Sequence, residues 1–120
     1  MQQVGRHWVG PYREAQGHHP HQQAARSNNP NYDRYFAISV QNGTFDHGAI
    51  SALQAEKHRE FLKSGGTIQN YNLGVEEAIQ RQAMRAGGFT DGEIEEILQL
   101  SRQELIRQGA LNPTRVPWGP

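Results

Sequence analysis

The amino-acid sequence predicts an α+β domain, in which an irregular β-hairpin-like segment and one helix are followed by two or three C-terminal helices. Residues 35–40, YFAISV, are rich in aromatic and β-branched side chains and are followed by the turn residues QNG, as is typical of a strand. Later segments repeat apolar residues at helical spacing and end at glycines. A strand signal followed by helical signals favours the α+β class.

The two ends of the chain carry signals against regular structure. Residues 1–31 have little apolar periodicity and are interrupted by glycines and prolines, so we expect loops and short extended pieces. Within them the polar stretch 22–31, QQAARSNNPN, indicates a loop. The tail LNPTRVPWGP is expected to be extended, because proline disfavours the helical conformation in the residue before it.

Three helices are predicted from caps and apolar spacing. The first covers 46–64 with Asp46 as its N-cap, and the second covers about 73–86. The third begins at Thr90, and Glu93 completes a capping box with it. Their apolar faces contain, in order, Ile50, Leu53 and Phe61; Val75, Ile79, Ala83 and Met84; and Ile94, Ile97, Leu98, Leu105 and Ile106.

Length, charge and cysteine content narrow the class of protein. A chain of 120 residues and 13.5 kDa has room for one domain, with a histidine-bearing part at 1–64 and a helical part with the tail at 65–120. Twelve basic and twelve acidic residues give no net charge, which excludes a strongly basic nucleic-acid coat. The absence of cysteine excludes disulfides, thiolate zinc sites and thiol nucleophiles, and leaves histidine, carboxylate, hydroxyl and amide chemistry.

The sequence shows no membrane span and no export signal. Its apolar runs are too short to cross a bilayer. The start, MQQVGRHW, lacks the apolar core of a signal peptide. We therefore expect no membrane partner, and expect any passage across a membrane to depend on another polypeptide.

The histidines are the groups with chemical content, and all of them lie in the first half of the chain. The run Gly17-His18-His19-Pro20-His21 is followed, after the predicted strand, by a further histidine at a helix start. Neutral imidazole suits both a general base near neutral pH and a ligand of divalent metals, the two needs of phosphodiester hydrolysis. Paired histidines in a polar loop are also common as plain exposed residues, so this run alone leaves both readings open.

A polar stripe follows the first predicted helix. His47, Ser51, Gln54 and His58 recur along one face. His47 and His58 are about 16 Å apart at about 1.5 Å per residue, so they do not share one ion, and His47 is the better candidate. Such a stripe by itself is also typical of a solvated face.

Several separated blocks of the sequence resemble a known family. VGPYREAQGHHPHQQAA, YFAISV, DHGAISALQ and LIRQGALNPTRVPWG occur in this order between residues 9 and 119. Together they resemble the C-terminal toxin domains of bacterial polymorphic toxins, including Rhs-type ones, that carry a GHH signature. Those domains are assigned to the HNH/endonuclease VII superfamily, in which two strands and a helix surround one divalent cation. The resemblance implies this ββα-metal core, with the additional C-terminal helices covering it.

The resemblance assigns roles to individual histidines. His18 matches the metal-binding first member of the superfamily pair, and His19 matches the general base. His47 matches the downstream metal ligand. His21 belongs to the GHHxH version of the motif, as a ligand, a phosphate contact or a group behind the ligands. Arg13 is expected to contact the phosphate, with Arg26 and Arg34 as alternatives.

The ligand set implied by the resemblance is incomplete. Asn42 is the nearest counterpart of the middle Asn of HNH, and Asp46 is a candidate carboxylate ligand. The expected cofactor is one divalent metal ion, with Mg²⁺ favoured and Mn²⁺, Ni²⁺ or Zn²⁺ as alternatives. There is no Cys₄ zinc scaffold and no clear third ligand on the helix, so the ion is expected to keep several waters or to gain a carboxylate.

The resemblance also implies a biological setting. It predicts a metal-dependent endonuclease toxin that hydrolyses DNA in the cytoplasm of a target cell, after secretion as part of a larger effector polypeptide. A cognate immunity protein is the expected partner, and the free domain is expected to be a monomer.

Two alternatives remain at the level of sequence. The same fold can act on RNA, because contacts to the 2′-hydroxyl and the shape of the groove decide between the two substrates. A non-catalytic helical module is the other, in which the acidic helices over 73–109 bind a partner and the histidines hold a structural metal or nothing.

Overall fold

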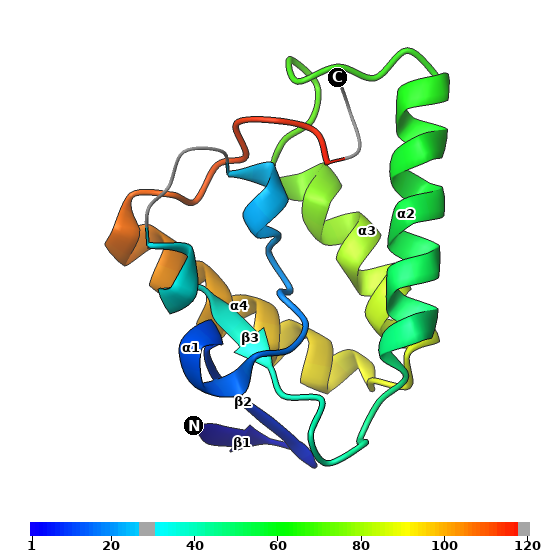
Figure 1. Ribbon diagram of the computed structural model, residues 1–120. Helices are drawn as coiled ribbons and strands as arrows, with labels where there is room; N and C mark the ends of the chain where they lie inside the picture. Colours follow the sequence, from blue (N-terminus) through cyan, green and yellow to red (C-terminus); the bar gives the residue numbers. More distant parts are fainter. Residues whose placement is uncertain (27–30, 118–120) are drawn as a thin grey trace.

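The chain folds into a three-stranded antiparallel sheet followed by three long helices, which confirms the expected α+β class (Figure 1). This computed structural model describes residues 1–26 and 31–117. Within these ranges, no helix is both long enough and apolar enough to cross a membrane.

The sheet is built from short strands in the order β1-β2-β3. Strands β1 (Gln2–Val4) and β2 (His7–Pro11) form a hairpin, and Gly5 in its turn has a φ of 57°, which glycine adopts without strain. Strand β3 (Phe36–Ile38) pairs with β2. The expected strand is therefore confirmed over its central part, and the expected N-terminal extended pieces are the hairpin.

A short helix follows the hairpin directly and was not expected from the sequence. It is α1 (Tyr12–Ala15), and it ends at Gln16 in the left-handed region with a φ of 49°. The amide of Tyr12 donates to the carbonyl of Tyr35 over 2.8 Å and so ties α1 to the segment before β3. Single turns of 3₁₀ helix occur at η1 (Gln23–Ala25) and η2 (Tyr32–Arg34).

The three long helices begin and end close to where the caps predict. Helix α2 (His47–Lys63) starts after Asp46, whose side chain accepts a hydrogen bond from the Ala49 amide. Helix α3 (Leu73–Ala86) has the predicted bounds. Helix α4 (Asp91–Gln108) has the predicted capping box. The tail through residue 117 contains no helix, as expected, and Trp118 lies outside the described residues.

The core lies between the sheet and the long helices. Helix α4 packs on the sheet, α3 packs on α4, and α2 packs on α3 (Figure 1). Ile106, expected on the apolar face of α4, is 61% exposed instead. The core cluster is formed by Val4, Val9, Ile38, Ile50, Ala83, Met84, Phe89, Ile94, Ile97 and Leu98.

The second half of the polar stripe of α2 is not a solvated face. Gln54 and His58 are buried against α3 and the segment before it. His58 donates from Nδ1 to the carbonyl of Gln54 over 2.6 Å and accepts at Nε2 from the Tyr71 hydroxyl over 2.9 Å. Burial lowers the pKa of His58, so it is a neutral structural residue.

A buried ion pair anchors the loop that follows the histidine run. Arg26 and Glu76 form two hydrogen bonds of 2.7 Å each, and both side chains are buried. The same guanidinium donates to the carbonyls of Ala110 and Leu111, 2.7 and 2.8 Å away. One arginine therefore joins the loop, α3 and the start of the tail.

Candidate active site

Three of the predicted histidines meet in one pocket. His18, His19 and His47 line a cavity of about 240 Å³ between the loop that follows α1 and the first turns of α2. They come from segments that the strand β3 separates in the sequence. The remaining lining residues are Gly17, Gln22, Gln23, Ala24, Ser51 and Gln54.

The backbone around Gly17 sets the position of the histidine pair. A Cβ atom at Gly17 would overlap the carbonyl group of Ile38, so only glycine permits this close approach. The next residue, His18, exchanges two backbone hydrogen bonds with Ile38, of 3.0 and 2.8 Å. The glycine of the motif thus allows the loop to extend the sheet by one bridge, directly at the histidines.

One ring nitrogen of His18 donates a hydrogen bond to a buried glutamine, which in turn bonds to a second glutamine. The Nε2 atom of His18 donates to Oε1 of Gln80 over 2.9 Å, and Nε2 of Gln80 donates to Oε1 of Gln54 over 2.8 Å. Because Nε2 carries the proton, Nδ1 of the neutral ring keeps a lone pair. This arrangement is typical of metal-binding histidines, whose second nitrogen is held by a hydrogen-bond acceptor.

His18 is also neutral at physiological pH. Burial lowers its pKa to about 4, and the nearby His47 and His19 act in the same direction, while the bond to Gln80 opposes them. Metal ions bind the neutral imidazole, so His18 needs to lose no proton before it binds a cation.

His47 lies at the exposed N-terminus of α2, and its ring faces that of His18. The two ring centroids are 5.7 Å apart at an interplanar angle of 67°. Zinc, for example, lies about 2.0–2.1 Å from each imidazole nitrogen that binds it, so two rings at this separation are close enough to bind one cation when a nitrogen of each points toward it. The pair is therefore the candidate metal site.

Gln22 presents an oxygen atom that has no partner in the described part of the chain. Its Oε1 atom is buried and makes no hydrogen bond there. The backbone of Gln22 is held on both sides, because its amide donates to Glu76 over 3.1 Å and its carbonyl accepts from Arg26 over 3.1 Å. A buried carbonyl oxygen without a partner is costly unless something binds it, and hard cations and water both bind such oxygens.

Residues 1–26 and 31–117 contain no cluster of three or more histidine or carboxylate side chains suited to one metal ion. Asp46, the candidate carboxylate, instead caps α2 through the Ala49 amide. Asn42 lies exposed in the preceding turn and does not line the pocket. An ion at His18 and His47 would therefore complete its coordination with amide oxygens, water or substrate.

His19 is held by two tyrosine rings. It stacks on Tyr12 with centroids 4.6 Å apart, and Tyr35 meets it edge to face at 6.2 Å. Burial lowers the pKa of His19, and the backbone of Phe36 partly opposes that change, so its ring is also neutral at physiological pH. Its Nδ1 atom is buried without a hydrogen bond among the described residues.

Other predicted site residues lie elsewhere. His21 is buried, with Nδ1 2.6 Å from the Ser101 hydroxyl and Nε2 2.7 Å from the Glu77 carboxylate, so neither nitrogen is available to a phosphate. Arg26 is committed to Glu76. Arg13 and Arg34 line a different pocket.

Gln80 and Gln22 belong to the site but are not predicted from the sequence. The sequence could have indicated Gln80, because it lies on the face of the 73–86 helix that also carries apolar residues, and a polar side chain there needs a buried partner. Nothing in the sequence indicates Gln22, since it belongs to a polar stretch that is typical of a loop.

Comparison with known proteins adds no assignment to this geometry. No family model, curated protein or solved structure matches the chain. The pocket and the sequence blocks described above are therefore the basis for the function.

Proposed function

We propose that this chain is a divalent-metal-dependent endonuclease that hydrolyses phosphodiester bonds of DNA. The observation that carries the proposal is the shared pocket of His18, His19 and His47. In it, one neutral imidazole has a lone pair beside a second imidazole, and a third neutral imidazole lies next to them. A cation site with an adjacent base is what phosphodiester hydrolysis requires.

His18 and His47 would hold the metal ion in this proposal, and Gln22 would offer its side-chain oxygen to the site. Gln80 keeps His18 in the tautomer that binds metal. When bound, a divalent cation such as Mg²⁺ supplies positive charge that stabilises the attacked phosphate and the departing 3′ oxygen. The arrangement, with His18 bridged to β3 and His47 opening α2, is compatible with the ββα-metal core that the sequence implies.

His19 acts as the general base. Its neutral imidazole accepts a proton from the attacking water, whose oxygen forms a bond to phosphorus while the bond from phosphorus to the 3′ oxygen breaks. The leaving oxygen takes its proton from solvent. Tyr12 and Tyr35 fix the plane of the imidazole, and the lowered pKa keeps it unprotonated before the reaction.

The biological role follows from the resemblance of the sequence blocks. In that role the chain is the toxin domain of a secreted effector, restrained in the producing cell by an immunity protein. Soluble expression of the chain alone in a bacterial cytoplasm is expected to arrest growth and fragment the chromosome. Expression of the His19→Ala variant at the same level is expected to be tolerated, and normal growth with the parent chain would contradict the toxin role.

The activity is tested with purified protein, supercoiled plasmid and total RNA. Each substrate is incubated with Mg²⁺, Mn²⁺, Ni²⁺, Zn²⁺ or EDTA, and nicked or linear plasmid is expected with a divalent ion and not with EDTA. Cleavage of RNA with intact plasmid would favour the ribonuclease alternative. Failure to cut either substrate would contradict the enzymatic proposal and favour the partner-binding module.

A further inference from the structure

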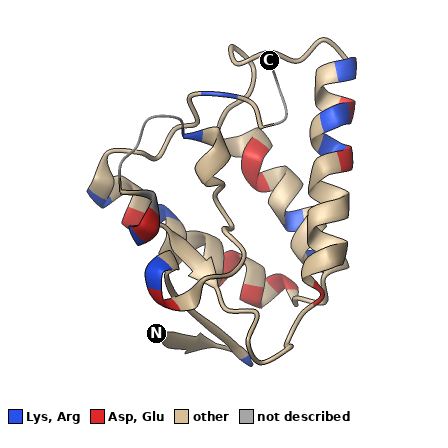
Figure 2. Ribbon diagram, in the orientation of Figure 1, with Lys and Arg blue, Asp and Glu red and all other residues tan. Residues whose placement is uncertain are grey.

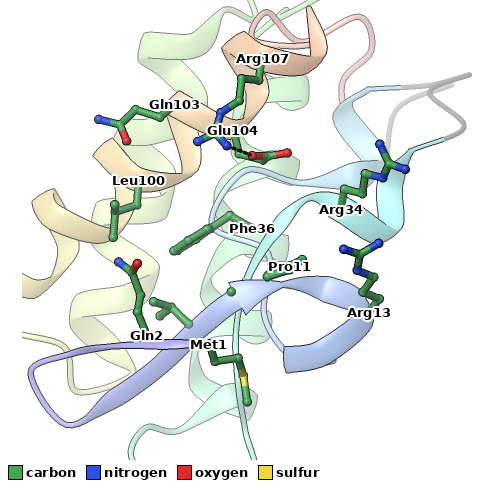
Figure 3. Close-up of a pocket in the computed structure, with 12 residues that line it drawn as sticks. Met1, Gln2, Pro11, Arg13, Arg34, Phe36, Leu100, Gln103, Glu104 and Arg107 are labelled. Atoms are coloured by element: carbon green, nitrogen blue, oxygen red, sulfur yellow. Dashed lines mark ion pairs between the residues drawn. The ribbon is translucent and has the colours of Figure 1, made fainter.

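A second pocket, of about 530 Å³, lies on the other side of β3 from the histidine loop, between the sheet with α1 and the C-terminal half of α4. Arginines from three separate elements line it, namely Arg13 of α1, Arg34 of η2 and Arg107 of α4 (Figure 3). Figure 2 shows the basic segments of these elements along one side of the molecule. The fold therefore brings these basic side chains together, although they do not form a basic run in the sequence.

Two of these arginines have no counter-charge among the described residues. Arg13 and Arg34 are exposed, and neither side chain makes a hydrogen bond or ion pair within residues 1–26 and 31–117. Arg107, across the pocket, pairs with Glu104 at 3.2 Å, and Glu104 is the one carboxylate among the lining residues (Figure 3). By contrast, Arg81, Arg85 and Arg102 of the helices all contact carboxylates. Neighbouring unpaired guanidinium groups favour an anion between them.

The two unpaired arginines are joined to the candidate active site through the backbone. Arg13 follows Tyr12 and Arg34 precedes Tyr35, and these two tyrosines are the rings that contact His19. The hydrogen bond between the Tyr12 amide and the Tyr35 carbonyl fixes the two segments to each other. Both arginines therefore lie one residue away from a tyrosine that contacts His19, a lining residue of the histidine pocket.

Apolar side chains line the second pocket between the arginines and α4. Phe36 and Pro11 lie between the pair Arg13 and Arg34 and Leu100 on the opposite wall, which is α4 (Figure 3). Guanidinium groups match phosphate oxygens in a two-pronged geometry, and exposed aromatic rings stack on bases. A nucleotide offers both an anion and a flat apolar ring, whereas an acidic peptide offers only the anion.

We propose that this pocket binds a nucleotide of the same nucleic-acid strand that is cut at the histidines, with its phosphate at Arg13 and Arg34 and its base or sugar on Phe36. This inference rests on the proposed function, since it takes the substrate to be a nucleic-acid strand. In this proposal the second pocket binds the nucleic-acid strand, and the histidine pocket cleaves it.

The test measures binding of a fluorescent single-stranded DNA to the His19→Ala chain in EDTA, so that no cleavage interferes. Adding Arg13→Ala and Arg34→Ala is expected to weaken binding at least about tenfold. The slope of log affinity against log salt concentration should become shallower by about 0.7 for each phosphate that the variant no longer binds. The control adds Arg59→Ala and Lys63→Ala, which remove the same charge from exposed positions on α2 and are expected to weaken binding only two- to threefold. Equally weakened binding in the two double variants would overturn the proposal, because net charge alone would then explain binding.

Two further measurements separate this inference from the proposed function. With His19 intact, the Arg13→Ala/Arg34→Ala chain should cut long DNA with a raised KM. Its loss of kcat/KM should be larger for long DNA than for bis(p-nitrophenyl) phosphate, which is too small to reach both pockets. A parent chain that cuts neither substrate contradicts the proposed function, while an unchanged KM for DNA contradicts only the pocket. Displacement of labelled DNA by oligoglutamate as effectively as by unlabelled DNA of equal charge would show an acidic-peptide site and overturn the nucleotide assignment.

Discussion

The Nε2 atom of His18 donates a hydrogen bond to Oε1 of Gln80, 62 positions further along the chain, over 2.9 Å. This bond determines which nitrogen of His18 carries the proton and which keeps the lone pair. It places a residue of α3 behind the candidate metal ligand, although α3 contributes no lining residue to the histidine pocket.

Replacing Gln80 with leucine is expected to weaken metal binding. The variant removes the acceptor, so His18 loses the partner that fixes its tautomer and ring orientation, and removing such a partner typically costs about 10- to 100-fold in metal affinity. Titration with Mn²⁺ followed by calorimetry measures this directly. Gln82→Leu, an exposed change on the same helix, is the control and should bind Mn²⁺ like the parent. Unchanged affinity in Gln80→Leu would remove His18 from the ligand set.

Gly17→Ala is expected to disturb the histidine pocket. The added Cβ meets the Ile38 carbonyl, so the backbone must move and the bridge between His18 and Ile38 must open. We expect a lower melting temperature and weaker Mn²⁺ binding. Gly92→Ala, in the first turn of α4 with open space around it, should stabilise the protein by about 0.5–1 kcal/mol instead. Equal melting temperatures for the two variants would contradict this role of Gly17.

The helices could be predicted from sequence because their ends depend on local chemistry. Asp46 bonds to an amide three residues away, and Thr90 and Glu93 bond to each other. Such caps involve residues only three positions apart, so they can be found without knowledge of the tertiary fold. The histidine run and the later histidine could likewise be singled out, because imidazole chemistry is a property of the residue type.

The parts that sequence does not predict depend on contacts between distant residues. Polar side chains on α2 look like a solvated face until α3 packs on them, when Gln54 meets Gln80 and His58 meets Tyr71. The buried role of His21 likewise depends on groups in α3 and α4. Helix α1 is a single turn of four residues, too short to leave a periodic signal.

Arg26→Met is expected to destabilise the protein strongly. It leaves the buried Glu76 carboxylate without its cation and frees the start of the tail, and breaking such a pair typically costs about 3–5 kcal/mol. Urea unfolding followed by circular dichroism provides the measurement. Arg85→Met breaks the exposed pair with Asp91 and should cost about 0–1 kcal/mol. Similar costs for both variants would contradict an anchoring role for Arg26.

Stability in EDTA is expected to fall as the pH decreases from about 6.5 toward 4. The pKa of His18 is about 4 in the folded protein and near 6.5 when unfolded, so between these values the unfolded chain binds the extra proton. Above pH 6.5 this effect vanishes. At pH 4 it amounts to about 3 kcal/mol at most. The lowered pKa values of His19 and His58 act in the same direction.

Urea unfolding of the parent and of His18→Gln across this pH range measures the contribution of His18. The variant lacks the titrating group, so its stability should depend less steeply on pH. Parallel curves for the two proteins would mean that His18 is not buried in its neutral form.

In the proposed function His19 is the general base, while His18 and His47 bind the metal ion. This assignment is tested most directly by His19→Ala, with plasmid cleavage and Mn²⁺ affinity measured on the same preparation. Because His19 is assigned as base and not as ligand, cleavage should slow by a factor on the order of 10² to 10⁴ while the affinity for Mn²⁺ stays within about twofold of the parent. His47→Ala should lose both properties together. Cleavage by His19→Ala at the parent rate, or loss of Mn²⁺ binding in step with activity, would contradict the assignment.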